Sequence, residues 1–89
     1  MREWTMQLPR NLRHGGTIYR VEVIGVERSD QTWEGRLRFS EVDAKSVTTG
    51  EETSQPNRDA LEYWATGLEM VYLEGALQRA IDAASRGGA

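Results

Sequence analysis

The stretch over residues 57–85, NRDALEYWATGLEMVYLEGALQRAIDAAS, decides the fold because two apolar stripes run along it. The first stripe consists of Leu61, Trp64, Leu68, Val71 and Gly75. The second stripe consists of Met70, Leu73, Leu77, Ala80 and Ala84. Within each stripe the residues recur at intervals of three and four, which is typical of an α-helix with about 3.6 residues per turn. The pattern therefore predicts one long helix over residues 57–85.

On a single continuous helix the two stripes lie on nearly opposite sides. A helix that covers one core needs only one apolar stripe. We expect the first stripe to cover a sheet and the second to meet a second copy of the chain, since two-fold dimers are the commonest oligomers. The predicted interface consists of Met70, Leu73, Leu77, Ala80, Ile81 and Ala84. The alternative cover is an N-terminal arm that carries Trp4, Met6, Leu8 and Leu12.

Alternating apolar and charged residues predict two strands before this helix. Residues 19–23 and 33–39 both show the period of two that marks a half-buried strand, and Gly25 would allow a bulge or bend where the first alternation slips. A shorter edge strand is expected at residues 45–49. Residues 3–8 form either a further strand or an arm. The expected fold is α+β, an antiparallel sheet of three or four strands with one long C-terminal helix packed across one face.

A single domain is expected, because 89 residues fall below the roughly 100–200 that domains usually contain. Ser54 or Asn57 is the expected N-cap of the helix, with Asp59 in its first turn. The expected divisions are an N-terminal arm or strand (1–16), a β-sheet (17–50), a loop (51–56), the long helix (57–85) and a frayed tail (86–89).

Composition narrows the class of protein further. The chain contains no cysteine, which excludes a disulfide and a thiolate zinc site. No apolar run approaches the ~20 residues of a membrane span, and charged residues interrupt the first twelve, so we expect a cytoplasmic protein without a secretory signal. The net charge of −3 combines +2 over residues 1–40 (seven arginines, five acids) with −5 over residues 41–89 (four basic residues, nine acids).

Candidate catalytic residues do not form a recognisable set. His14 is the one histidine, and it precedes two glycines, which is typical of a turn residue. The serines lack a neighbouring base with an orienting acid, and the carboxylate pairs Glu41/Asp43 and Glu51/Glu52 are expected in solvated loops. No catalytic, cofactor-binding or metal-binding residue is predicted, and no enzymatic activity is expected.

A nucleic-acid interface is a further hypothesis from the strand pattern. Arg20, Arg36 and Arg38 would lie on the outer face of the sheet. Glu22 and Glu34 share that face, so cross-strand ion pairs account for the pattern without a nucleic acid. The aromatic residues of the two strands point to the core, whereas single-strand binders stack bases on exposed aromatic rings.

The order of the elements resembles the HicB-like antitoxin domain. The resemblance covers residues 19 to about 77 and rests on VTTG at residues 47–50, followed through Thr53 by the helix that contains Ala60 and Leu61. It implies the strand–strand–strand–helix order, dimerisation and a regulatory role toward a partner protein. The Leu-Pro-Gly segment of that family is replaced by SEVDA at residues 40–44, so no functional residue is transferred.

Together these patterns predict a small non-enzymatic protein-interaction domain that homodimerises through its long helix. A HicB-like regulatory partner protein and a nucleic-acid binder are the alternatives. No cofactor is expected.

Overall fold

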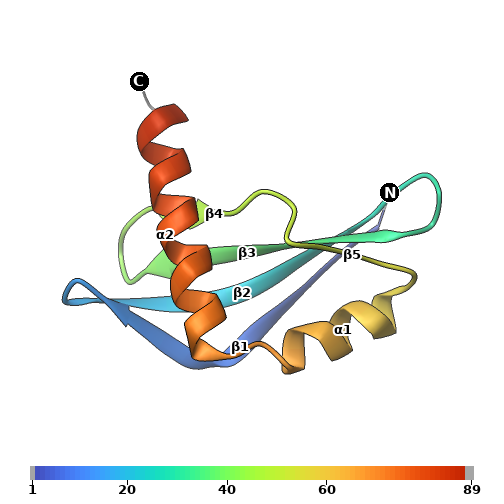
Figure 1. Ribbon diagram of the computed structural model, residues 1–89, viewed down its shortest axis with the longest axis horizontal. Helices are drawn as coiled ribbons and strands as arrows, with labels where there is room; N and C mark the ends of the chain where they lie inside the picture. Colours follow the sequence, from blue (N-terminus) through green and yellow to red (C-terminus); the bar gives the residue numbers. More distant parts are fainter. Residues whose placement is uncertain (1, 88–89) are drawn as a thin grey trace.

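The computed structural model describes residues 2–87, and over these the chain forms five strands and two helices (Figure 1). The elements are β1 (Glu3–His14), β2 (Thr17–Glu27), β3 (Trp33–Glu41), β4 (Ser46–Thr48), β5 (Thr53–Gln55), α1 (Arg58–Thr66) and α2 (Met70–Gly87). The α+β class is confirmed. Both helices cover the same face of one antiparallel sheet, α1 over the end that carries β5 and α2 over the end that carries β4.

The sheet has the order β1-β2-β3-β4, with every neighbour antiparallel. Its outer strand beside β3 is split in two. β4 opposes residues 38–40 of β3, and β5 opposes residues 33–35. The edge strand predicted at residues 45–49 is therefore confirmed as β4, while the loop predicted at residues 51–56 contains the strand β5.

The N-terminal segment is a strand rather than an arm. β1 runs for 12 residues and pairs with β2 from Glu3↔Val26 to His14↔Thr17. Its register shifts between Gln7 and Asn11, so the bulge lies in β1. Of the bulge or bend that Gly25 would allow, the bulge is absent, because β2 pairs with β3 in continuous register through that residue.

Thr49 closes the gap between β4 and β5. Its backbone N donates to the Leu37 carbonyl at 2.9 Å, and its Oγ1 accepts from the Leu37 N at 3.0 Å. The same hydroxyl donates to the Gly50 carbonyl at 2.8 Å. One buried side chain thus satisfies polar groups where the edge strand leaves the ladder.

The single long helix predicted over residues 57–85 is wrong, because the chain turns at Gly67. α1 ends at Thr66 and α2 begins at Met70. Residues 86 and 87 belong to α2 instead of a frayed tail, and residues 88–89 of that predicted tail lie outside the described residues. The expected N-cap at Asn57 is confirmed, since its Oδ1 accepts from the Ala60 N at 2.8 Å.

The turn is favoured because it lets both apolar stripes reach the same core. α1 buries Leu61 of the first stripe, and α2 buries Leu73 and Leu77 of the second. Burial of each leucine contributes about 1.5–3 kcal/mol, whereas each helical hydrogen bond is worth about 0.5–1.5 kcal/mol. Gly67 lowers the free-energy cost of breaking the helix further, because a glycine within a helix is about 1 kcal/mol less stable than an alanine.

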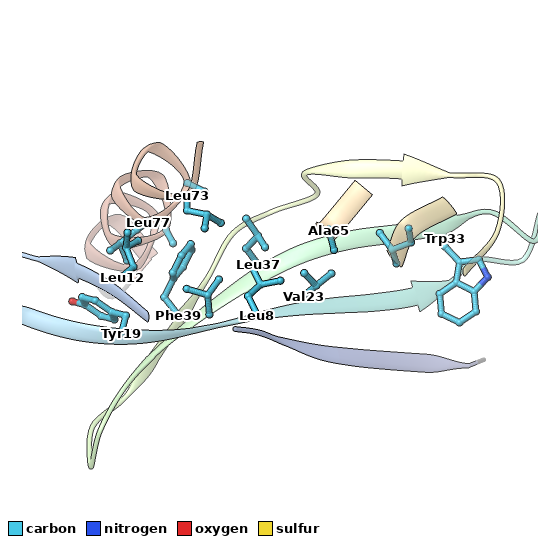
Figure 2. Close-up of a cluster of buried hydrophobic side chains, with 14 residues drawn as sticks. Leu8, Leu12, Tyr19, Val23, Trp33, Leu37, Phe39, Ala65, Leu73 and Leu77 are labelled. Carbon is cyan, nitrogen blue, oxygen red and sulfur yellow. The ribbon is translucent and has the colours of Figure 1, made fainter. Parts of the chain in front are cut away.

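The core lies between the sheet and the two helices (Figure 2). Its buried apolar residues are Leu8, Leu12, Tyr19, Val21, Val23, Trp33, Leu37, Phe39, Leu61, Ala65, Leu73, Ala76, Leu77 and Ala80. In Figure 2 the side chains of β1, β2 and β3 rise from one face of the sheet toward the helices. The predicted assignment of Tyr19, Trp33 and Phe39 to the core side is therefore confirmed.

Candidate interaction surface

Half of the residues of the interface predicted on the second stripe are buried in the chain's own core. Leu73, Leu77 and Ala80 are buried, and Leu77 is 0% exposed. They belong to the same cluster as Leu8 and Leu12 of β1. The N-terminal segment therefore covers this stripe, as the alternative predicted, though as a strand of the sheet.

The remaining predicted interface residues do not form a seam. Met70 and Ile81 are partly buried and pack against the core, and Ala84 is exposed. Gly75 makes no close backbone approach to another element, since a Cβ there would meet only the Arg79 Nη1 within 4 Å, at 3.6 Å. After the turn at Gly67, Leu73, Leu77 and Ala80 of the predicted seam face the chain's own core, and homodimerisation stays a prediction.

The turn leaves a different apolar surface outside. A groove of about 710 Å³ lies between α1 and α2, and we call it the junction groove. Its lining residues are Gln55, Ala60, Tyr63, Trp64, Gly67, Leu68, Glu69, Val71 and Tyr72. Tyr63 is 82% exposed and Val71 is 78% exposed, both high values for large apolar side chains. Contiguous exposed apolar surface of this kind marks binding sites on many proteins.

One wall of the junction groove is held in place by the loop before β5. The Arg79 Nη2 lies 2.6 Å from the Glu52 Oε1, and the Tyr72 hydroxyl donates to the same oxygen. The Glu52 side chain is 8% exposed, and its backbone N donates to the Gly35 carbonyl at 2.8 Å. The Tyr72 ring is therefore fixed relative to the sheet by a chain of polar contacts.

The aromatic contacts strengthen that wall. The Trp64 and Tyr72 rings meet edge to face, with centroids 6.3 Å apart and an interplanar angle of 89°. The Arg79 guanidinium carbon lies 5.8 Å from the Tyr72 ring centroid. Partial burial raises the pKa of the Tyr72 hydroxyl, and its hydrogen bond to Glu52 raises that pKa further. The Tyr72 hydroxyl therefore keeps its proton to a higher pH than an exposed tyrosine would.

A second hollow, of about 690 Å³, lies beside Trp4 at the start of α1. The Arg58 guanidinium carbon lies 5.8 Å from the Trp4 ring centroid. The Arg2 Nε forms an ion pair with the Glu27 Oε1 at 3.0 Å on the same rim. Charged side chains (Arg2, Glu3, Glu27, Arg58 and Asp59) make up half of the lining of this hollow, whereas Glu69 is the one charged residue that lines the junction groove.

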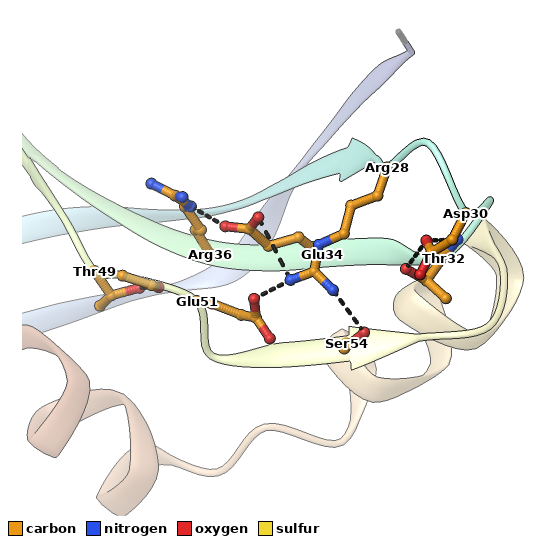
Figure 3. Close-up of polar contacts among 9 residues, drawn as sticks. Arg28, Asp30, Thr32, Glu34, Arg36, Thr49, Glu51 and Ser54 are labelled. Carbon is orange, nitrogen blue, oxygen red and sulfur yellow. Dashed lines mark hydrogen bonds and ion pairs between the residues drawn. The ribbon is translucent and has the colours of Figure 1, made fainter.

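The arginines predicted for a nucleic-acid face are mostly paired with acids. Arg38 contacts Glu22 at 3.0 Å, and these residues are direct cross-strand partners. Arg36 pairs with Glu34 within β3 (Figure 3). Figure 3 also shows Arg28 drawn toward Glu34 and Glu51, with its Nη1 donating to the Ser54 Oγ at 3.1 Å. The predicted cross-strand pairing is confirmed at Arg38, and Arg20 has no ion pair among residues 2–87.

The remaining candidates are structural. His14 ends β1 just before Gly15 and Gly16, whose φ values of 58° and 83° form the turn into β2. No group of three or more His, Cys, Asp or Glu in the described part of the chain is placed to hold a metal ion. No helix within that part is long and apolar enough to cross a membrane.

The sequence patterns did not point to the two tyrosines of the junction groove. Tyr63 and Tyr72 belong to neither stripe. Gly67 was the signal that could have found them, because glycine disfavours a continuous helix and α1 ends just before it. Trp64, Leu68 and Val71 continue that stripe into the groove instead.

Comparison with models of protein families, with curated proteins and with solved structures finds no match for this chain. The resemblance to the HicB-like antitoxin domain therefore stays a prediction from the order of the elements. Any functional argument has to come from the surface itself.

Proposed function

We propose that the chain is a non-enzymatic protein-binding domain that receives a short segment of a different protein in the junction groove. The observation that carries this proposal is the exposure of Tyr63 and Val71 beside a wall that is already fixed by Tyr72, Glu52 and Arg79. The groove is lined by aromatic and aliphatic side chains, and of its lining residues only Glu69 is charged. Such walls suit apolar docking rather than acid–base chemistry.

The size of the exposed surface favours a short segment over a second copy. A tyrosine side chain buries about 150–250 Å² at most, so Tyr63, Tyr72 and Val71 together offer only a few hundred Å². A stable dimer buries about 800 Å² on each partner. An amphipathic segment with two or three apolar side chains matches the smaller area.

The sheet edges offer less for a partner than the groove does. β1 is an outer strand, but Pro9 lies in it and its register shifts between Gln7 and Asn11. Proline and a bulge both oppose the addition of a further strand. The other edge is covered by β4 and β5, which are three residues each. The junction groove is therefore the surface that best supports binding.

Selection from a displayed library of random dodecapeptides tests the proposal. Peptides would be selected on the wild-type chain and then measured on a Tyr63→Ser, Val71→Ser variant by isothermal titration calorimetry. Each removed apolar contact is expected to weaken binding by about ten-fold or more. Ile18→Ser is the matched control, because Ile18 is 44% exposed on β2, away from the groove.

Two outcomes would overturn the proposal. Peptides that bind the double variant as well as the wild type would place recognition elsewhere. A dimer in sedimentation velocity that dissociates in the Val71→Ser variant would show that a second copy occupies the groove. Retention of binding by the Ile18→Ser variant and its loss in the double variant would support the proposal.

Nucleic-acid binding through Arg20, Arg36 and Arg38 has less support, because Glu34 and Glu22 neutralise two of the three arginines. A HicB-like regulatory role is a compatible form of partner binding. A gel shift with mixed single- and double-stranded oligonucleotides at low salt tests the first alternative directly.

A further inference from the structure

We infer that the segment that occupies the junction groove carries a basic residue next to its apolar anchors. This inference rests on the proposed function and adds the charge of the partner to it. It comes from the distribution of carboxylates around the groove, which is independent of the apolar surface that located the groove.

Acidic residues outnumber basic ones over residues 52–79, which we call the rim and which run from the loop before β5 through α1 to the first half of α2. The acids are Glu52, Asp59, Glu62, Glu69 and Glu74, and the bases are Arg58 and Arg79. Five acids against two bases give a local formal charge of −3. A field of one sign around an apolar site attracts segments of the opposite sign and speeds their association.

Both basic residues of the rim are already engaged. Arg79 contacts Glu52 at 2.6 Å, and Arg58 contacts Asp59 at 3.4 Å and Glu62 at 3.9 Å. In residues 2–87, Glu69 and Glu74 form no ion pair within 4.0 Å. Glu69 and Glu74 therefore carry −2 of this −3, and the remaining −1 comes from the single Arg58 that faces both Asp59 and Glu62.

Their positions place this charge beside the exposed apolar residues. Glu69 lines the groove, and its carbonyl accepts from the Leu73 N at 3.0 Å at the start of α2. Glu74 is three residues after Val71 on α2, so the two side chains are neighbours on the helix surface. A partner that covers Val71 would desolvate both carboxylates in part. A basic residue in that partner would offset the cost, and an acidic one would add to it.

The dodecapeptides selected on the wild-type chain provide the test. We expect lysine and arginine to be enriched among the binders relative to the unselected library. Replacing the basic residue of the strongest binder with glutamate should weaken its binding by about ten-fold or more, and raising the salt concentration should weaken the unmodified peptide.

Charge reversal on the protein tests this inference separately from the proposed function. Glu69→Lys should weaken binding of the basic peptide and restore binding of the glutamate-substituted peptide. Asp82→Lys should change the binding of neither peptide. Asp82 is an exposed acid farther along α2, outside the lining of the groove. Glu69→Gln is the gentler variant, because a lysine at the start of α2 also opposes the helix dipole.

The possible failures are distinguishable. Peptides that need Tyr63 and Val71 but show no basic enrichment and no response at Glu69 would overturn the inference and leave the proposed function standing. Peptides that bind independently of Tyr63 and Val71 would overturn both. A second copy in the groove, detected by sedimentation, would also overturn both.

Discussion

Gly25 and Gly35 lie directly opposite each other on β2 and β3, and Leu61 of α1 fills the space above them. A Cβ on Gly25 would lie 2.6 Å from the Leu61 Cδ2, and a Cβ on Gly35 would lie 2.7 Å from the Leu61 Cδ1. Two absent side chains thus create the socket that fixes α1 on the sheet. The position of the junction groove depends on this contact, because α1 forms one of its walls.

Alanine at either glycine should push α1 away from the sheet. Gly25→Ala and Gly35→Ala are each expected to lower the free energy of unfolding by about 1–3 kcal/mol through overpacking. Urea denaturation measures this loss. Gly50→Ala is the control, because a Cβ there meets nothing within 4 Å. The socket is contradicted if Gly25→Ala and Gly50→Ala are equally stable.

The hydroxyl of Thr49 should contribute more than its methyl group. Thr49→Val leaves the Leu37 N and the Gly50 carbonyl without that partner, so we expect a loss of about 1–3 kcal/mol in the free energy of unfolding. Thr49→Ser keeps the hydroxyl and should lose less. Hydrogen exchange at the Leu37 amide gives a local readout, and equal protection in both variants would argue against the bond.

Truncation to alanine should lower the free energy of unfolding strongly at Leu77 and hardly at all at Val71. Leu77→Ala is expected to lower the free energy of unfolding by about 2–5 kcal/mol, because Leu77 is fully buried. Val71→Ala should change it by less than about 0.5 kcal/mol, since Val71 is exposed. Thermal unfolding at several protein concentrations checks both values. A wild-type stability that rises with protein concentration would indicate self-association, and loss of that rise in Val71→Ala would place the contact at Val71.

Tyr72 should make stability depend on alkaline pH. Its pKa is raised in the folded protein, so the folded state holds the hydroxyl proton to higher pH than the unfolded state does. The stabilisation is complete below about pH 10, the pKa of an unfolded tyrosine, and is lost as the pH rises through the folded pKa. Tyr72→Phe should flatten this alkaline decline in urea unfolding. In ultraviolet absorbance, the wild type should show a phenolate transition at high pH that the Tyr72→Phe variant lacks.

β2 and β3 were predictable because each shows one face to the core. Tyr19, Val21 and Val23 alternate with charged residues, and burial follows that alternation. The fate of residues 3–8 was undecided from sequence, because Trp4, Met6 and Leu8 would alternate equally in a strand or an arm. Pairing with β2 settles the matter, and pairing is a long-range relationship that local periodicity does not contain.

The helix break was hidden by continuous spacing. Leu61, Trp64, Leu68 and Val71 keep intervals of three and four across Gly67, so the pattern alone extends one helix through the turn. The break is decided by how much apolar surface α1 and α2 together bury against one sheet. That burial depends on the tertiary structure and not on local spacing. The break also changes which residues face outward. Leu73 and Leu77 of the second stripe are buried, whereas Val71 of the first stripe is exposed.

Because of the turn at Gly67, the directions in which the side chains of α1 and α2 point are set independently of each other. Residues inserted within a continuous helix rotate all later side chains by about 100° each. Between Gly67 and Met70 the chain is not helical, so one inserted residue can be absorbed as a longer connection. The same insertion after Ala76 would carry Leu77 and Ala80 out of the core. Length variation in this domain should therefore be tolerated at the helix junction and nowhere else along α1 or α2.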